Sequence, residues 1–223
     1  MELAKLLIAS IEAAGESFVS GELAFLALTS KVERPLLDRV SFQLHRVLES
    51  EGLVVAREYR IAAGVRADAA VLKNGELLAA LEAKAMYTAD CTRRGGFDRQ
   101  YPDLLNADLH RYGTLRAGEL RVYSLLLGTH LLSAPPRTLS RVIKYPTMIG
   151  QAFKAHNDAK GIRTVAEKNL ASFIRSEVRI ADGTIEAGMA FGVEVDVMWW
   201  LYGPFGGSQG WEILRQGLPS LPA

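Results

Sequence analysis

The sequence contains a single cysteine, Cys91, among its 223 residues. No disulfide can therefore form within the chain, and a cytoplasmic location is the expectation. Apolar runs of the ~18 residues that span a bilayer are also missing, so we expect no association with a membrane. The N-terminal stretch MELAKLLIASIEAAGES carries acidic residues inside its apolar pattern and indicates an amphipathic helix, not a signal peptide.

The chain has no strong excess of either charge. Its formal net charge is +1, so composition alone does not indicate a nucleic-acid-binding protein. Basic residues are nevertheless concentrated between residues 93 and 144, where nine lysines and arginines stand against four acidic residues. This local excess of positive charge could form one face or be dispersed over a solvated surface. A hydrophobic content of 49% is ordinary for a globular protein with a sizeable core.

Hydrophobic periodicity predicts an alternation of helices and strands. Apolar residues at helical spacing predict helices over residues 2–14, from Ser20 or Gly21 to Ala27, from Pro35 to about Ser50, and over 103–115. Strands are predicted over 53–61, on either side of Asn74-Gly75, and over 121–127. Residues 140–175 read as mostly helical, with a break near Lys160-Gly161. Residues 178–180 and 188–202 read as strands, with Asp182-Gly183 as a turn.

This order predicts an α/β fold with a central mixed sheet flanked by helices. We expect one domain overall, in three parts. Residues 1–30 form an N-terminal helical extension and residues 31–130 form the core. Residues 131–223 add helices and a β-hairpin that pack on the core.

The stretch RADAAVLKNGELLAALEAKA, residues 66–85, places charges where a core would exclude them. Both strands of this predicted hairpin are apolar except for Asp68 in the first and Glu82 in the second, with Lys84 two residues on. A buried carboxylate costs several kcal/mol, as an order of magnitude, unless it is paired or bound to a metal. Carboxylate oxygens are the ligands that Mg²⁺ prefers. The pattern therefore predicts a polar site at the end of the sheet.

Asp68, followed after thirteen residues by Glu82-Ala83-Lys84, resembles the motif of the PD-(D/E)XK nuclease superfamily, whose fold is restriction-endonuclease-like. The predicted order helix–strand–strand–strand–helix–strand is similar to the core of that fold and covers roughly residues 33–128. The resemblance implies that Asp68 and Glu82 bind Mg²⁺, for which Mn²⁺ can substitute, and that Lys84 assists the water that attacks a phosphodiester. Ala67 stands where the family's motif has proline.

The turn between the strands decides whether these side chains can meet. A two-residue type I′ turn at Asn74-Gly75 would place Asp68 and Glu82 on opposite faces of the hairpin. A three-residue loop, Lys73-Asn74-Gly75, would place both carboxylates and Lys84 on one face. We therefore predict the three-residue loop, or another loop or bulge that shifts the register by one residue.

Further residues are candidates by position. Many relatives resemble one another in having a glutamate at the start of the first core helix, and Glu33 matches that place, with Asp38 as a competitor and a helix-dipole role as the alternative. Glu58 on the first strand could join the cluster or face solvent.

The loop after Lys84 is rich in arginine and glycine. Arg93 and Arg94 precede Gly95-Gly96, and Arg99 follows, so this segment could contact the phosphates of a nucleic acid. The alternative is a set of solvated arginines. The four histidines are scattered without the spacing of metal ligands, and the three tryptophans are more typical of a core than of base stacking.

The sequence thus predicts a Mg²⁺-dependent endonuclease that hydrolyses DNA in preference to RNA, with Asp68, Glu82, Lys84 and Glu33 at its site. Residues outside the core could supply specificity or the surface of a homodimer. Two alternatives remain open. One is a catalytically silent nucleic-acid-binding or protein-interaction module on the same fold. The other is an unrelated α/β protein whose hairpin charges pair with one another.

Overall fold

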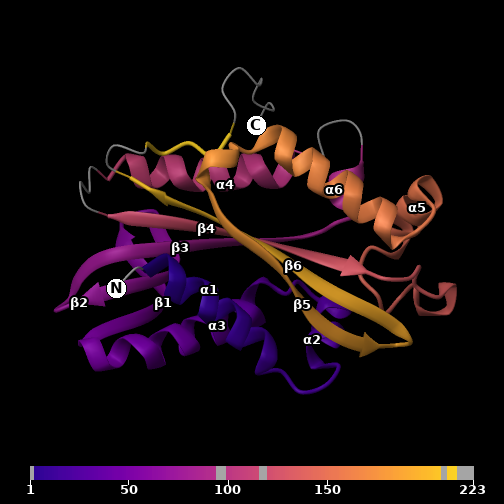
Figure 1. The fold of residues 1–223 in the computed structure, drawn as a ribbon, viewed down its shortest axis with the longest axis horizontal. Helices are drawn as coiled ribbons and strands as arrows, with labels where there is room; N and C mark the ends of the chain where they lie inside the picture. Colours follow the sequence, from indigo (N-terminus) through magenta and orange to yellow (C-terminus); the bar gives the residue numbers. More distant parts are fainter. Residues whose placement is uncertain (1–2, 94–98, 116–119, 207–209, 215–223) are drawn as a thin grey trace.

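The protein folds around one six-stranded mixed sheet with helices on both faces, as a computed structural model shows for residues 3–93, 99–115, 120–206 and 210–214 (Figure 1). The strand order is β1-β2-β3-β4-β6-β5. The predicted α/β class with a mixed sheet flanked by helices is therefore confirmed.

Three helices cover one face of the sheet. They are α1 (Leu3–Glu16), α2 (Glu22–Thr29) and α3 (Glu33–Leu48). In α1 the side chains of Leu7, Ile11 and Ala14 lie at helical spacing and are buried, which is why this stretch forms an amphipathic helix. A 3₁₀ turn, Glu49–Glu51, follows α3, and Gly52 ends it with a φ of 69° that favours glycine. The predicted helices are confirmed to within a few residues.

The next three strands form an antiparallel meander. They are β1 (Leu53–Ala62), β2 (Val65–Lys73) and β3 (Glu76–Tyr87). The turn between β2 and β3 has two residues, because Lys73 pairs with Glu76, and Asn74 and Gly75 have φ values of 52° and 84°. The predicted three-residue loop is therefore wrong, since Asn-Gly satisfies a type I′ turn by itself.

A bulge in β3 supplies the register shift instead. Leu72 pairs with Leu77 but Val71 pairs with Ala79, so Leu78 is an extra residue in the ladder. Beyond the bulge, the last paired residues are Ala69 and Leu81. Asp68 and Glu82 come directly after this pair, so their side chains lie on the same face of the hairpin. The expectation of a bulge that shifts the register by one is confirmed.

The chain then crosses to the centre of the sheet. Helix α4 (Gln100–Gly113) leads from β3 to β4 (Arg121–Leu131), which runs parallel to β3. Parallel neighbours need such a crossover. Strand β4 is buried from its second residue to its last, as expected for a central strand covered on both faces.

Two further helices and a hairpin complete the sheet. Helices α5 (Pro146–His156) and α6 (Ala159–Phe173) precede β5 (Arg179–Ala190) and β6 (Val193–Phe205), and β6 pairs antiparallel with β4. The hairpin of β5 and β6 therefore extends the sheet of the core. The predicted limits of the three parts of the domain stay predictions.

Two sequence-based assignments in this region are wrong. The hairpin turn lies at Phe191-Gly192, where both φ values are positive, and Asp182-Gly183 lies inside β5. The helical break lies at Asn157-Asp158 and not at Lys160-Gly161, because the Asp158 side chain accepts a hydrogen bond from the N–H of Gly161 and caps α6.

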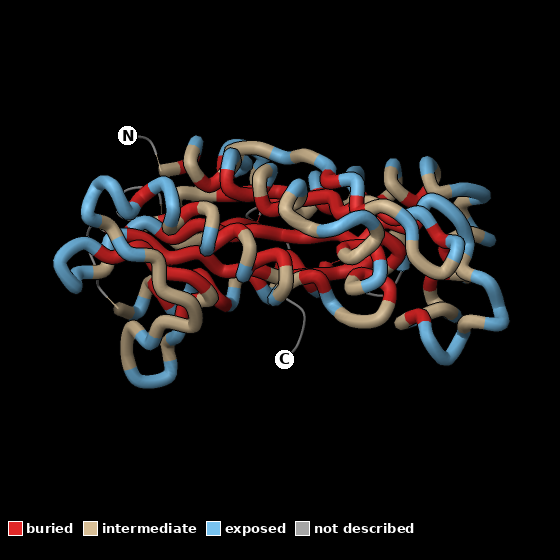
Figure 2. The backbone as a smooth tube through the Cα atoms, turned by 90° about the horizontal axis from the view of Figure 1, so that it is seen from below, coloured by how far each residue is buried: buried red, intermediate tan, exposed pale blue. Residues whose placement is uncertain are grey.

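The sheet separates two apolar cores. One lies beneath α1, α2 and α3, and the other lies between the sheet and α4 and α6. Figure 2 shows the buried segments concentrated in the strands through the middle of the molecule. Within the described ranges, no helix has both the length and the apolar character that crossing a bilayer requires.

Candidate active site

The site lies along the edge of β3 where β2 no longer pairs with it. The last pair between these strands is Ala69 with Leu81. Beyond it, alternate N–H groups of β3 would lack acceptors, which is costly for a buried strand. Three carboxylates supply the acceptors: Ala83 N donates to Asp68 Oδ2 (2.8 Å), Ala85 N to Glu33 Oε2 (2.9 Å) and Tyr87 N to Asp90 Oδ2 (3.0 Å). We call these three carboxylates the edge row.

Glu82 and Lys84 extend from the same strand toward α4. Glu82 is only 3% exposed, whereas Lys84 is partly exposed, and Lys84 Nζ lies 4.0 Å from Glu82 Oε2. Lys84 Nζ also donates to the backbone oxygen of Ala83 at 3.2 Å. The two strand positions, separated by one residue, therefore put a carboxylate and an ammonium beside each other, as the sequence predicted.

Helix α4 contributes two side chains that hold this pair. Asp108 Oδ2 lies 2.6 Å from Lys84 Nζ, and the hydroxyl of Tyr112 donates to Glu82 Oε1 at 2.5 Å. Asp108 and Tyr112 are four residues apart and so share one face of the helix. Asp108 is 4% exposed and also pairs with Arg111 on its solvent side.

The electrostatics of the cluster are dominated by buried negative charge. Burial and the neighbouring charge of Asp68 raise the pKa of Glu82 to about 8. Burial alone would lower the pKa of Lys84, but the hydrogen bond and charge of Asp108, with the charges of Glu82 and Asp68, raise it. Burial also raises the pKa of Glu33, against the hydrogen bond from Ala85. One partly exposed ammonium, that of Lys84, thus offsets several carboxylates.

This imbalance bears on whether the residues fit a divalent cation. Asp68 and Glu82 provide hard carboxylate oxygens, the type that Mg²⁺ and Mn²⁺ bind, and added positive charge would relieve their repulsion. Among the described residues, no group of three His, Cys, Asp or Glu side chains is arranged as a ready-made metal site. The donor chemistry fits a cation held by two carboxylates.

The structure brings Asp68, Glu82, Lys84 and Glu33 together, the four residues that the sequence predicted. Their mutual electrostatic effects and their hydrogen bonds to one stretch of β3 place them in one cluster. The competitors lie elsewhere: Asp38 is exposed and pairs with Arg57 at 2.7 Å, and Glu58 pairs with Arg66 at 2.9 Å.

The three arginines predicted to contact nucleic acid differ in placement. Arg93 is exposed just after the 3₁₀ turn Asp90–Thr92, and Arg94 lies outside the described residues. Arg99 is only 5% exposed, pairs with Asp103 at 2.9 Å and lies over the Phe173 ring. Its guanidinium is therefore part of the interior, and its predicted role as a phosphate contact is wrong.

Cations and tyrosines surround Asp90, the last member of the edge row. The charges of Arg93 and Lys31 both act on the Asp90 carboxyl, and burial is what raises its pKa. Lys31 Nζ lies 5.7 Å from the ring centroid of Tyr101, whose hydroxyl donates to Asp90. Lys31 also acts on Glu33, so this group adjoins the cluster.

Tyr145 extends this group. Its ring meets that of Tyr87 edge-on at a centroid distance of 5.5 Å, and Lys144 Nζ lies 5.5 Å from the centroid of the Tyr145 ring. The residue as a whole is 45% exposed. Its backbone has a φ of 55°, a left-handed conformation that is uncommon for a bulky residue. We call Lys31, Arg93, Lys144 and Tyr145 the basic flank.

Sequence reasoning missed Asp108 and Tyr112 as site residues. A signal was present, because Leu105, Asp108, Leu109 and Tyr112 follow helical spacing and all four are buried. An aspartate inside an apolar helical stripe needs a partner in the core. That partner, Lys84, lies on a distant strand, so the stripe alone could not identify it.

Comparison with known proteins identifies no relative. No family model matches the chain, no curated protein matches it, and no solved structure matches it.

Proposed function

We propose that this protein is a divalent-metal-dependent nuclease with a restriction-endonuclease-like core of the PD-(D/E)XK type. The observation that carries the proposal is the convergence of Asp68, Glu82 and Lys84, which depends on a bulge at Leu78 that the motif alone does not require. The observed order α3–β1–β2–β3–α4–β4 supports it, because it is the element order of that core.

Asp68 and Glu82 would hold the Mg²⁺ or Mn²⁺ ion. When bound, such an ion supplies a water of lowered pKa and offsets negative charge at a scissile phosphate. Tyr112 fixes the orientation of Glu82 through its hydrogen bond, and Asp108 fixes the ammonium of Lys84. Lys84, with its raised pKa, stays protonated and donates hydrogen bonds toward the attacking water or a phosphate oxygen.

Nucleic acid is the substrate that the surroundings favour. The basic flank lies next to the edge row and combines ammonium and guanidinium groups with an exposed aromatic ring. Cations track a phosphate backbone, and an exposed ring can stack on a base. DNA remains the preferred substrate in this proposal, and a homodimer remains an open part of it.

A catalytically silent module is the second candidate, and one contact favours it. Lys84 Nζ lies 2.6 Å from Asp108, closer than to Glu82, so its ammonium is engaged in an internal ion pair. In a protein that binds nucleic acid without cleaving it, Lys84 would keep this ion pair with Asp108 when nucleic acid is bound.

Cleavage of supercoiled, linear and single-stranded DNA with Mg²⁺ tests the proposal. The wild-type chain should cleave at least one of these substrates and lose cleavage in EDTA. Glu82→Gln and Lys84→Met should each lower the rate by about a hundredfold or more while keeping the circular dichroism spectrum. Glu76→Gln, at the exposed far end of the same strand, is the matched control and should cleave as wild type.

Two results would decide against catalysis. Binding of DNA without cleavage under any metal condition favours the silent module. Cleavage that survives both substitutions would mean that another site or a contaminant is responsible.

A further inference from the structure

One buried hydroxyl beside the candidate active site has no partner in the part of the chain that the structure describes. Ser124 on β4 is 0% exposed, and its Oγ makes no hydrogen bond with any described residue. Buried hydroxyls are nearly always hydrogen-bonded, because burial removes the water that would otherwise bond to them. The surroundings of Ser124 should therefore explain why a hydroxyl is placed there.

Strand pairing places Ser124 next to Glu82. In the parallel pair of β3 and β4, the register partner of Ser124 is Glu82. Register partners lie on the same face of a sheet, and neighbouring strands are about 4.7–4.9 Å apart. Val122 and Leu126, which precede and follow Ser124 on this face of β4, are both fully buried. Ser124 is thus a polar residue within an apolar stretch, at the position beside the buried carboxylate.

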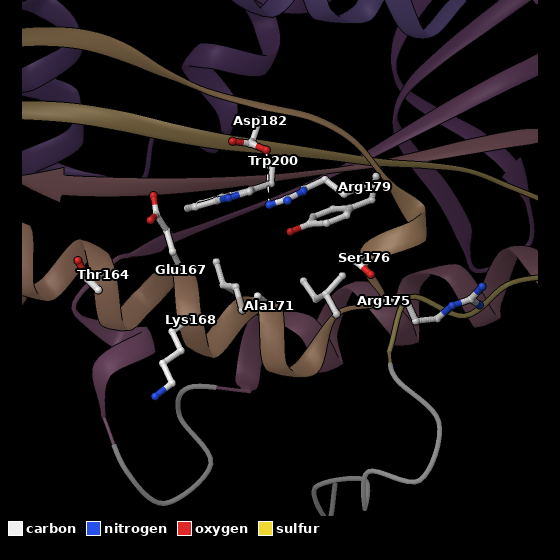
Figure 3. A pocket seen from close by; sticks show the side chains of 12 residues that line it. Thr164, Glu167, Lys168, Ala171, Arg175, Ser176, Arg179, Asp182 and Trp200 are labelled. Carbon is white, nitrogen blue, oxygen red and sulfur yellow. Dashed lines mark ion pairs between the residues drawn. The ribbon is translucent and has the colours of Figure 1, made fainter.

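The other neighbour of Ser124 offers no comparable acceptor. On β6 its partner is Tyr202, which lines a cavity of about 440 Å³ between α6 and the outer strands (Figure 3). The two carboxylates of this cavity, those of Glu167 and Asp182, belong to α6 and β5, and each is paired with an arginine. The carboxylate next to Ser124 in the sheet is therefore that of Glu82.

Glu82 has capacity for a further donor. Its Oε1 accepts the hydrogen bond from Tyr112, and its Oε2 lies 4.0 Å from Lys84 Nζ. The two oxygens of a carboxylate can together accept about four hydrogen bonds. A serine side chain turns among three staggered positions, so the Ser124 hydroxyl can be redirected toward Glu82 while the strands stay paired.

We propose that Ser124 is a positioning residue for Glu82, whose carboxylate receives a hydrogen bond from the Ser124 hydroxyl when Glu82 holds a divalent cation. The inference rests on the proposed function, because it concerns the carboxylate that would hold the cation. Hydrogen bonds to a charged carboxylate are stronger than those between neutral groups. An unpaired hydroxyl gives up no other hydrogen bond when it turns toward that carboxylate. Ser124 should therefore favour cation binding while making the cation-free chain less stable.

Two measurements on the full chain without nucleic acid test these opposite effects. Isothermal titration calorimetry gives the affinity for Mn²⁺, and urea unfolding in EDTA gives the stability of the cation-free chain. Ser124→Ala should weaken Mn²⁺ binding about tenfold, the usual size of a hydrogen bond to a charged group. Its urea midpoint should not fall below that of the wild type, because the hydroxyl that it removes is unpaired.

A second variant separates the hydroxyl from packing. Ser124→Thr keeps the hydroxyl and adds a methyl group at a site with no exposed surface, so it should lower the urea midpoint. It should nevertheless bind Mn²⁺ more tightly than Ser124→Ala does. A purely structural role would make affinity follow stability, with Ser124→Thr as the weaker binder of the two.

Ser41 provides the matched control. It is also buried, and its Oγ has no hydrogen bond among the described residues, but it lies on α3, across the sheet from α4. Ser41→Ala should leave Mn²⁺ binding unchanged. The inference is overturned if Ser124→Ala binds Mn²⁺ as tightly as the wild type, or if Ser41→Ala weakens binding to the same degree.

The same titrations distinguish failure of this inference from failure of the proposed function. If the wild type does not bind Mn²⁺, or if Glu82→Gln binds it equally well, the proposed metal site is wrong and the role of Ser124 is wrong with it. If Glu82→Gln weakens binding and Ser124→Ala does not, the proposed metal site stands and only the role of Ser124 is wrong.

Discussion

The polar residues inside the apolar strands have a backbone role in addition to the chemical role that we propose for them. Asp68, Glu33 and Asp90 each accept a hydrogen bond from an N–H of β3 that has no strand neighbour. An edge N–H that is partly buried needs such an acceptor. One oxygen of each carboxylate is therefore fixed by the fold.

Residue types alone identified part of this site. Asp68, Glu82 and Lys84 could be predicted because a charge inside an apolar strand is rare and has few explanations. Asp108 could not be assigned, because its contact with Lys84 joins residues that are 24 positions apart on different elements. Arg99 was assigned wrongly, since an arginine beside glycines suggests exposure until its partner Asp103 is known.

A buried histidine makes stability depend on pH. His130 on β4 is 2% exposed, and its Nδ1 lies 2.9 Å from Thr88 Oγ1. Burial lowers the pKa of His130 to about 4, so between about pH 4 and 6.5 the unfolded chain binds a proton that the folded chain does not. Stability should therefore fall as the pH drops from 6.5 to 4, by at most about 1.4 kcal/mol per pH unit from this group.

Urea unfolding across this pH range measures the effect. His130→Gln should make the free energy of unfolding depend less on pH than in the wild type. His110→Gln, at an exposed helical position, should leave this pH dependence unchanged. Parallel profiles for wild type and His130→Gln would contradict this role for the histidine.

Hairpin registers show where local sequence is sufficient and where it is not. Asn74-Gly75 specifies its turn by itself, because both positions need positive φ. The bulge at Leu78 is set by more distant constraints: β3 is paired along its length with β4 from Ala79 onward, and its polar side chains must face α4. No local pattern indicates which residue becomes the extra one.

The turn predicted at Asp182-Gly183 was wrong for a related reason. Asp-Gly is a strong turn signal, yet Gly183 lies within β5 opposite Trp199. A Cβ at Gly183 would lie 2.6 Å from Cζ2 of Trp199, so the glycine is there to admit the indole ring. A glycine within a strand can mark such a close approach, and only the partner strand reveals it.

Paired glycine substitutions test this explanation. Gly183→Ala should destabilise the fold by about 1–3 kcal/mol, because the buried ring or the strand must move. Gly150→Ala, in α5, meets no atom within 4 Å and should stabilise by about 0.5–1 kcal/mol. Chemical denaturation measures both. Equal effects for the two variants would mean that the close approach of the Trp199 ring does not constrain Gly183.

At the scale of the whole molecule, the sheet order explains why the site lies where it does. Strand β3 has a parallel neighbour, β4, on one side and loses its antiparallel neighbour, β2, partway along the other. The edge row occupies this opening, with α3 on one face and α4 on the other. The class of the fold could be predicted from periodicity, but the opening depends on how far two strands stay paired.

Under the proposed function, the basic flank beside this opening is the surface along which we expect nucleic acid to approach. Binding is best measured in the Glu82→Gln variant, by fluorescence polarisation of a single-stranded oligonucleotide over a range of salt concentrations. Lys31→Glu should weaken binding and reduce the slope of log K against log salt by about 1, because one phosphate contact is lost. Tyr145→Ala should cost about 1–3 kcal/mol through lost stacking, with little change in slope.

The matched control places the same charge reversal elsewhere on the molecule. Lys73, at the turn-side end of β2, is exposed and lies five residues along the strand from Asp68. Lys73→Glu should change affinity far less than Lys31→Glu, because screening limits the reach of an exposed charge to about 10 Å at ordinary ionic strength. If both reversals weaken binding equally, the protein attracts nucleic acid through its overall charge. The basic flank would then not be the path by which a strand reaches Asp68 and Glu82.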